Sequence, residues 1–241
     1  MRVCSLLQVG LIVFMAIGLT MCRQPAEQPA ETPAATEEPP ATETPQASGV
    51  DAPEAVAQQV RDIRDHMRKA RRRVRNGEKQ EASIELSEAA AVYAQRATES
   101  TGQVKEHLEF SASEFSGMAE RVFGTPVITI EEMDAAMTRA FWALAGYHYT
   151  RGADRWADGQ VPETAAHLNA SAMFIDESIG YLAGQREAES EALVLQMRDV
   201  ARQLERGVSP GNANFTAQIE DFGQKVKAYA DHVRERIALL G

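Results

Sequence analysis

Length, composition and charge limit this chain to one domain of ordinary size. It has 241 residues, with 25 Lys and Arg against 35 Asp and Glu and a formal net charge of −10, a length that suits a single folded unit with a real core. Because nucleic-acid binders usually carry a clear excess of basic residues, a nucleic-acid partner is not expected.

The first 21 residues have the pattern of an export signal. Arg2 is their only charged residue, and an apolar run extends from Leu6 to Met21. This run is too short for a comfortable membrane span, which needs about 20 apolar residues. Residues 1–21 are therefore predicted to be a signal peptide.

The end of this segment, Leu19-Thr20-Met21-Cys22, resembles the lipobox of bacterial lipoproteins. In that family a Leu three places before a Cys marks cleavage, and the Cys thiol takes up diacylglycerol. Leu19, Thr20 and Cys22 fit the pattern, whereas Met21 stands where the family has Gly, Ala or Ser. The resemblance implies that Cys22 is lipidated and that the protein is held on the periplasmic side of a membrane in a bacterial cell envelope. Two alternatives stay open, namely cleavage after Gly18, which releases a soluble periplasmic or secreted protein, and an uncleaved anchor.

Residues 22–54 are predicted to form a disordered tether. From 23 to 54 the chain holds seven of its ten prolines, seven acidic residues against one basic residue, no aromatic residue, and Val50 as the only branched aliphatic one. Such a segment cannot bury enough apolar area to offset its ordering entropy, so proline and like charges keep it extended. A segment of this kind is expected behind a lipidated cysteine, and the folded domain is predicted from 55 to 241.

The domain from 55 to 241 shows helical periodicity throughout. Apolar residues recur at steps of three and four along 56–74, 86–97, 104–122 and 215–233, the spacing of an apolar stripe on one helix face. The β-branched run TPVITI at 125–130 is short and lies between helical segments, so we expect a loop packed on the bundle. The sequence therefore predicts an all-α fold, an antiparallel helical bundle or helical repeat of about five to seven helices.

An internal repeat of roughly 82 residues runs through this domain. The same offset of 82 residues relates several pairs: Gly77 and Gly159, Leu86 and Leu168, Ala90 and Ala172, Gly102 and Gly184, and His66 and His148. These matches predict two pseudo-repeats and a final extra helix. Gly77 and Gly159 are expected to end helices, since glycine tolerates the left-handed conformation that closes a last turn. A kink or a tight turn is expected at Gly102 and Gly184.

No metal site is predicted. The chain has five histidines, and metal sites on helices usually need ligands three or four residues apart on one face. Two pairs have that spacing, Asp62 with His66 and Glu163 with His167, and we interpret both as ordinary pairs on helix surfaces. A metal-binding envelope protein is kept as an alternative.

Enzymatic activity is not expected either. The chain lacks a GxSxG elbow, an SxxK motif, a cysteine in a catalytic pattern and a glycine-rich phosphate loop. A helical bundle without a cofactor site is a poor scaffold for such chemistry. We predict a non-enzymatic protein without cofactors.

A basic cluster lies between Arg61 and Arg75. Five arginines follow helical spacing along one flank of the apolar stripe: Arg61, Arg64, Arg68, Arg72 and Arg75. One interpretation is attraction to anionic lipid headgroups or to an acidic partner. The other is structural, because cations suit the last turn of a helix and the next helix offers carboxylates across the hairpin: Glu78, Glu81, Glu85 and Glu88. We favour the structural interpretation, since the protein itself supplies the opposite charges.

The segment from Ala140 to Trp156 is apolar on most of its helical circumference. It holds five of the fifteen aromatic residues of the chain, and such a helix is expected at the centre of a bundle, surrounded by neighbours. Core packing is the default interpretation. The alternative is a ligand-binding module, in which a gap between the two repeat units binds a small anionic or aromatic ligand. Its binding residues are predicted to be His148, Arg151, Trp142 and Tyr149.

Together these patterns predict an exported, lipid-anchored α-helical protein of the bacterial cell envelope. It is expected to act without catalysis, as an interaction or scaffold module that contacts another envelope protein. Its contact with the membrane is expected through the N-terminal lipid.

Overall fold

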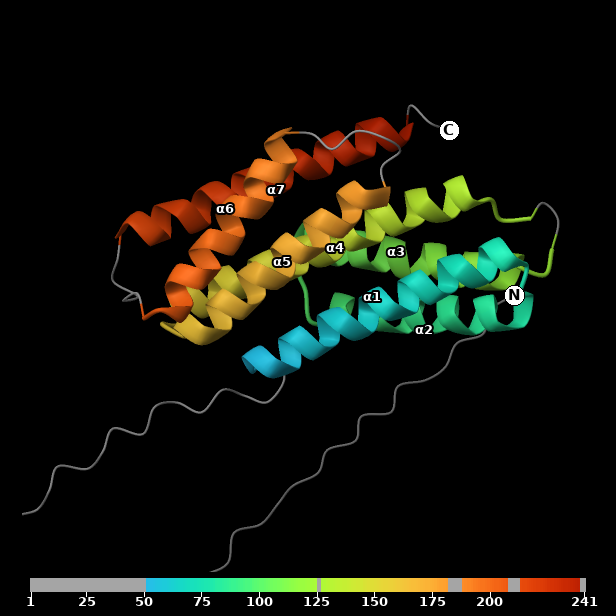
Figure 1. Ribbon diagram of the computed structural model, residues 1–241, viewed down its shortest axis with the longest axis horizontal. Helices are drawn as coiled ribbons and strands as arrows, with labels where there is room; N and C mark the ends of the chain where they lie inside the picture. Colours follow the sequence, from blue (N-terminus) through green and yellow to red (C-terminus); the bar gives the residue numbers. More distant parts are fainter. Residues whose placement is uncertain (1–50, 125–126, 182–187, 208–212, 239–241) are drawn as a thin grey trace, which may run out of the picture. The chain divides into compact units, whose positions relative to one another are not determined.

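Seven helices make up the described part of the protein, a computed structural model that covers residues 51–124, 127–181, 188–207 and 213–238 (Figure 1). The helices are α1 (Pro53–Asn76), α2 (Lys79–Thr98), α3 (Gly102–Arg121), α4 (Ile130–Ala157), α5 (Val161–Tyr181), α6 (Ala188–Glu205) and α7 (Ala213–Ala238). These residues contain no strand, and the predicted all-α bundle is confirmed. α1 begins at Pro53, slightly before the predicted start of the domain, because proline suits the first turn of a helix, where its missing N–H is not needed.

Glycines in the left-handed conformation follow helices where the sequence predicts it. Gly77 follows α1 with a φ of 71°, and Gly159 follows α4 with a φ of 76°. Gly102 has a φ of 58° and starts α3 after α2 has ended at Thr98, so it lies in a tight turn and not in a kinked helix. Gly184 lies outside the described residues.

The order of the helices fits the two units expected from the repeat. α1, α2 and α3 are followed by α4, α5 and α6, and α7 is the final helix. Equivalent residues are buried in both units, for example Leu86 of α2 and Leu168 of α5. The glycine stops and core positions match between the two halves, and the two pseudo-repeats stay a prediction.

The loop between α3 and α4 is described at residues 122–124 and 127–129. Ile128 is buried in the core, and the Thr129 hydroxyl caps α4 by accepting a hydrogen bond from the Glu132 backbone N–H at 3.1 Å. Phe123 and Val127 are more than half exposed, at 55% and 59%. The predicted packing of the TPVITI segment is thus found at Ile128, while the first two residues of that segment lie outside the described residues.

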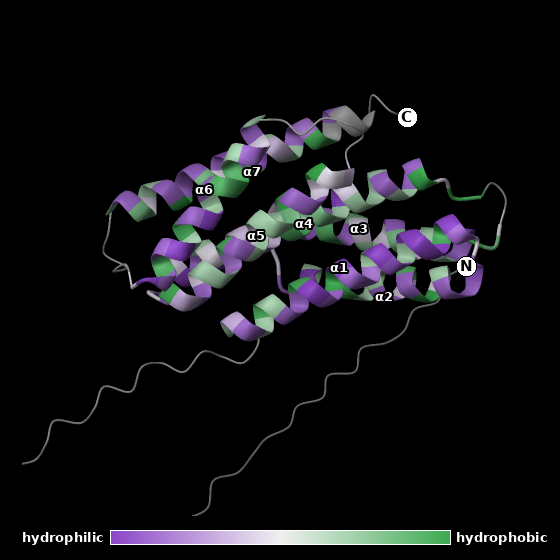
Figure 2. Ribbon diagram, viewed as in Figure 1, coloured by the Kyte–Doolittle hydropathy of each residue, from purple (hydrophilic) through white to green (hydrophobic). Residues whose placement is uncertain are grey.

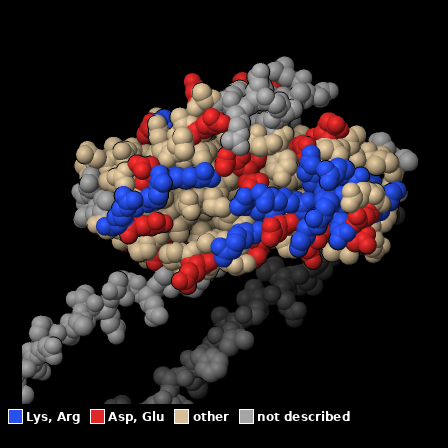
Figure 3. Space-filling view, in the orientation of Figure 1, with Lys and Arg blue, Asp and Glu red and all other residues tan. Residues whose placement is uncertain are grey.

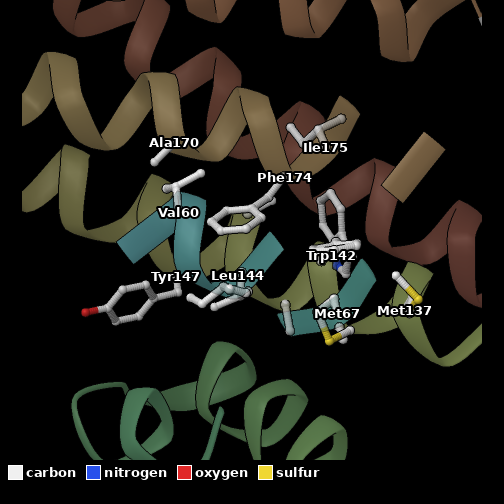
Figure 4. Close-up of a cluster of buried hydrophobic side chains, with 14 of the residues drawn as sticks. Val60, Met67, Met137, Trp142, Leu144, Tyr147, Ala170, Phe174 and Ile175 are labelled. Carbon is white, nitrogen blue, oxygen red and sulfur yellow. The ribbon is translucent and has the colours of Figure 1, made fainter. Parts of the chain in front are cut away.

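α4 lies at the centre of the helices. It packs against α1, α3, α5 and α7, and buried side chains cover most of its circumference, as predicted for the Ala140–Trp156 segment. Figure 4 shows Trp142, Leu144 and Tyr147 of this helix beside residues of α1 and α5. In Figure 2, α1 instead shows green and purple residues in alternation, as expected for a helix with one apolar face. None of the described helices is both long and apolar enough to cross a membrane.

Candidate functional site

Two buried histidines meet at the contact between α4 and α5. Gly152 lets the two helices approach closely, since a Cβ added there would lie 3.3 Å from the Cβ of His167. His148 of α4 and His167 of α5 are 1% and 2% exposed, and their Nδ1 atoms lie 3.0 Å apart. The His148 ring also stacks on Phe174 and contacts the ring of Tyr147 edge-on, two residues that Figure 4 labels.

Hydrogen-bond partners fix the tautomers of the two rings. The Asp51 carboxylate accepts a hydrogen bond from His167 Nε2 at 3.3 Å, so His167 carries its proton on Nε2. The Nδ1 of His167 is then an acceptor, and His148 donates from its own Nδ1. The result is a directed chain of hydrogen bonds from His148 through His167 to Asp51.

Asp51 is also held by two arginines. Arg151 and Arg155, one turn apart on α4, both donate to its carboxylate, Arg151 at 3.4 Å. Asp51 is only 4% exposed. Two guanidinium groups and one imidazole therefore enclose a single carboxylate, which comes from the chain just before α1.

Burial determines the charge states of the two histidines, and the neighbouring arginines determine that of Asp51. It holds the pKa of His148 well below the usual value near 6.5, and neighbouring positive charges lower that pKa further. Burial also lowers the pKa of His167 to about 4, against the opposing effect of Asp51. For Asp51, burial alone raises the pKa, but the hydrogen bond from Arg155 and the charges of Arg151, Arg155 and His167 outweigh it, so the pKa is lowered. At neutral pH both imidazoles are therefore neutral and Asp51 is ionised.

A second polar cluster adjoins the first on the α2 side of α4. Arg96, at the end of α2, is buried and donates two hydrogen bonds to Glu99 at 2.9 and 3.1 Å. Its guanidinium also donates to Gln59 of α1 at 2.8 Å and lies over the Tyr147 ring. The Tyr147 hydroxyl donates to Glu99 at 2.6 Å, and burial together with this bond raises the pKa of Tyr147 to about 12. Because Tyr147 and His148 are neighbours, α1, α2, α4 and α5 meet at one polar network.

The network is suited to holding helices together. An acid followed by two imidazoles is the order of groups in a proton relay, but a general base must reach the atom from which it takes a proton. Neither His148 nor His167 is more than 2% exposed, so the relay ends inside the protein. Its contribution is to fasten α4, α5 and the residues before α1 to one another.

His148 and Arg151, which the sequence predicts at a ligand gap, face groups of the chain itself. His148 contacts His167, and Arg151 donates to Asp51. The group that Arg151 binds is an anion, as expected for the predicted ligand, but this anion is the carboxylate of Asp51. The position next to Arg151 is therefore filled from within the protein.

Trp142 and Tyr149, the other two residues of the predicted ligand site, face α7. Trp142 packs edge-on against Tyr229 with ring centroids 5.0 Å apart, and the Tyr149 hydroxyl donates to the Ile219 carbonyl at 2.9 Å. Gly223 of α7 lies so close to the Tyr149 ring that it leaves no room for a Cβ. These contacts join α4 to α7, so the four residues do not form one site.

The prediction of an ordinary pair on a helix surface is wrong for Glu163 and His167, whereas Asp62 and His66 do lie at the surface but contact other residues. Glu163 and His167 are 7% and 2% exposed, because α5 packs against α1, α4 and α6. On α1, Asp62 accepts a hydrogen bond from a residue of its own helix, while His66 contacts Glu85 of α2. Spacing along one helix did not reveal which face a neighbouring helix covers.

The basic cluster of α1 is largely tied to other helices. Arg64 and Arg68 both donate to Glu177 of α5, at 2.7 and 2.8 Å, and the neighbouring Arg71 donates to Asp134 of α4 at 2.8 Å. The structural interpretation is supported, but these carboxylates come from α5 and α4 and not from α2, since α1 packs on all three helices. The remaining members are Arg61, which donates to Gln58, and the exposed Arg72 and Arg75. Figure 3 shows Asp and Glu among the basic residues on this face.

Sequence reasoning missed six residues of the polar network: Asp51, Gln59, Arg96, Glu99, Tyr147 and Arg155. Composition places Asp51 in the tether, because the surrounding segment is acidic and rich in proline. The one available signal is the position of Arg155, which lies four residues after Arg151 and therefore on the same helix face. Arg96 and Glu99 have the spacing of an ordinary pair on a helix surface.

The described residues define an all-α helical bundle with a buried polar network where α1, α2, α4 and α5 meet. This class rests on the fold and on the contacts described above. The chain matches no protein-family model, no curated protein and no solved structure.

Proposed function

We propose that the protein is an exported, membrane-tethered lipoprotein of a bacterial cell envelope that acts as a non-enzymatic interaction or scaffold module. The observation that carries this proposal is the order of three segments in the sequence: an export signal, the lipobox-like residues 19–22, and an acidic, proline-rich stretch that leads to the bundle. A lipid on Cys22 would hold the bundle on the periplasmic side of a membrane, at a distance set by the tether.

The contacts of Asp51 support a mechanical role for the segment before α1. Asp51 is paired with Arg151 and Arg155 of α4 and with His167 of α5. A pull on the tether therefore acts on the central helix of the bundle and on α5, and not on the first turn of α1 alone. A tethered module that resists peeling from its N-terminal end requires such a fastening.

Exposed apolar side chains support a role in protein contacts. Phe123 and Val127 of the α3–α4 loop are 55% and 59% exposed, Phe110 of α3 is 57% exposed and Leu195 of α6 is 64% exposed. Single apolar side chains are ordinary on a protein surface, so the proposal relies on Phe123 and Val127, which lie close together in one loop and are of the kind that anchors a protein–protein contact. Figure 2 shows the apolar character of the α3–α4 loop as a green segment. A second envelope protein is the partner that we propose.

Replacing Cys22 with Ser tests the lipid anchor. We expect labelled palmitate to be incorporated into the wild-type chain and not into the Cys22→Ser chain, because serine cannot form the thioether to diacylglycerol. Cys4→Ser is the matched control, since Cys4 lies in the predicted signal peptide and its loss should leave labelling unchanged. Label in all three chains, or in none of them, contradicts the proposed anchor.

A further inference from the structure

We propose that His66, Glu85 and Glu88 form a binding site for a divalent transition-metal ion, for which Zn²⁺ is the best match. His66 lies on α1, and Glu85 and Glu88 lie on the facing side of α2. Each residue offers one ligand atom, and these atoms all lie within 4.8 Å of one another. This site adds a ligand to the proposed interaction module and does not depend on the lipid anchor.

The three ligand atoms are close to the arrangement of a tetrahedral site. His66 Nδ1 lies 2.8 Å from Glu85 Oε2 and 3.1 Å from Glu88 Oε2. Zn²⁺ binds imidazole nitrogen and carboxylate oxygen at about 2.0–2.2 Å, which places neighbouring tetrahedral ligands about 3.3 Å apart. For the two distances from His66, shifts of a few tenths of an ångström therefore suffice, the two carboxylates lie within 4.8 Å of each other, and the fourth position is left to water.

The charges at this place favour a cation. In the described part of the chain no Lys or Arg forms an ion pair with Glu85 or Glu88, and Arg73, whose charge reaches Glu85, is paired with Glu78. By contrast, Glu177 and Asp134 at other helix contacts are paired with arginines. Two carboxylates that converge on one imidazole repel each other. A metal ion bound between them removes this repulsion and makes stability depend on added metal.

Exposure of the three side chains allows an ion to enter. The Glu88 side chain is 52% exposed and that of His66 is 35% exposed, while Glu85 is held at 16%. An ion from solvent therefore reaches the site without unfolding of the hairpin. One imidazole and two carboxylates suit Zn²⁺ better than Mg²⁺, which prefers octahedral oxygen ligands and keeps its waters.

The same position recurs in the second repeat unit with different chemistry. His148 and His167 lie 82 residues after His66 and Glu85, and they too contact each other, between α4 and α5. That pair is buried and is completed by Asp51 of the chain itself. In the first unit Glu85 stands in the place of His167, and the His66–Glu85 pair is partly exposed to solvent. There a metal ion takes the place that Asp51 has in the second unit.

Zn²⁺ titration of the protein tests this site. The chain from residue 22 onward with Cys22→Ser, free of any histidine tag, retains every described helix, all of which lie in the compact unit Pro45–Gly241. We expect one Zn²⁺ per chain by calorimetry, and at about 100 times the Kd a rise in Tm of about 5–10 °C. Mg²⁺ at the same concentration should leave Tm unchanged, and Co²⁺ should give the visible absorption of a tetrahedral complex.

Variants assign the site to the three residues. His66→Gln, Glu85→Gln and Glu88→Gln should each weaken Zn²⁺ binding at least about tenfold, and the half-exposed Glu88 can be changed without disturbing the core. Glu81→Gln, on an exposed part of α2, and His107→Gln, on α3, are the matched controls and should bind like the wild type. Absence of Zn²⁺ stabilisation, or equal weakening by the controls, overturns the proposal. A Tm that rises equally with Zn²⁺ in the wild type and in the His66→Gln chain also overturns it, because the ion is then bound elsewhere.

Discussion

Replacing Asp51 with Ala is expected to lower the free energy of unfolding by about 3 kcal/mol. The substitution removes the carboxylate that Arg151, Arg155 and His167 enclose. Arg151 then loses the carboxylate to which it donates, Arg155 keeps only the exposed Asp158, and the His167 Nε2–H loses its acceptor. Breaking a buried ion pair on one side is costly because the remaining charge stays desolvated. Urea unfolding followed by far-UV circular dichroism measures the change.

Asp158 provides the matched control for this experiment. It also pairs with Arg155, at 3.7 Å, but its side chain is 61% exposed. Asp158→Ala should therefore change the free energy of unfolding by less than about 0.5 kcal/mol. If the Asp51→Ala chain is as stable as the Asp158→Ala chain, the residues before α1 are not fastened to the bundle.

Lowering the pH is expected to destabilise the protein already at pH values well above those at which carboxylates titrate. The pKa of His167 is lowered to about 4 and that of His148 well below 6.5, so the unfolded chain binds more protons than the folded one as soon as the pH falls below about 6.5. Stability is full above that value and decreases as the pH is lowered toward the folded pKa values. Between pH values of about 7.5 and about 5 we expect His167 alone to contribute a loss of about 2 kcal/mol, and His148 adds to this loss in the same direction.

Asp51 acts in a lower pH window. Its pKa is lowered in the folded protein, so its contribution is complete above the unfolded value near 3.9 and is lost as the pH falls through the folded value. The pH range of the loss therefore distinguishes the contribution of the two histidines from that of the Asp51 carboxylate.

His148→Phe keeps an aromatic ring beside Phe174 and cannot take up a proton. This variant should roughly halve the loss of stability between about pH 7.5 and about pH 5. An unchanged pH dependence in that variant contradicts the assignment to the buried pair.

The helices themselves are predictable because their signals are local. Val56, Val60 and Ile63 recur at helical spacing, and the glycines at 77 and 159 follow the helices that they were expected to end. The central position of α4 also follows from its own composition, since a helix that is apolar on most sides needs neighbours on most sides.

The contacts between helices are not predictable in the same way. Arg64 pairs with Glu177, although Glu85 on the next helix offers a carboxylate much closer in sequence. Which carboxylate is used depends on α1 packing against α4 and α5 as well as α2. Periodicity shows that α1 has one apolar face, but it does not identify the helices that cover that face.

In the polar network, too, some residues are predictable from local sequence and others only from tertiary contacts. His148 and Arg151 stand out in the sequence because they interrupt an apolar, aromatic helix, and the structure does place them at a cluster of charges. Asp51, about one hundred residues away in the chain, is the carboxylate that accepts the hydrogen bonds of Arg151 and His167 and balances the positive charge. Its burial results from tertiary contacts, and composition alone assigns it to the tether.

Mass spectrometry of the mature N-terminus tests the central claim most directly. The proposed lipoprotein should begin at Cys22 and carry diacylglycerol on its sulfur, with the proline-rich tether intact behind it. A mature chain that begins at Leu19, or one that keeps residues 1–21 with an unmodified Cys22, would contradict the lipid anchor.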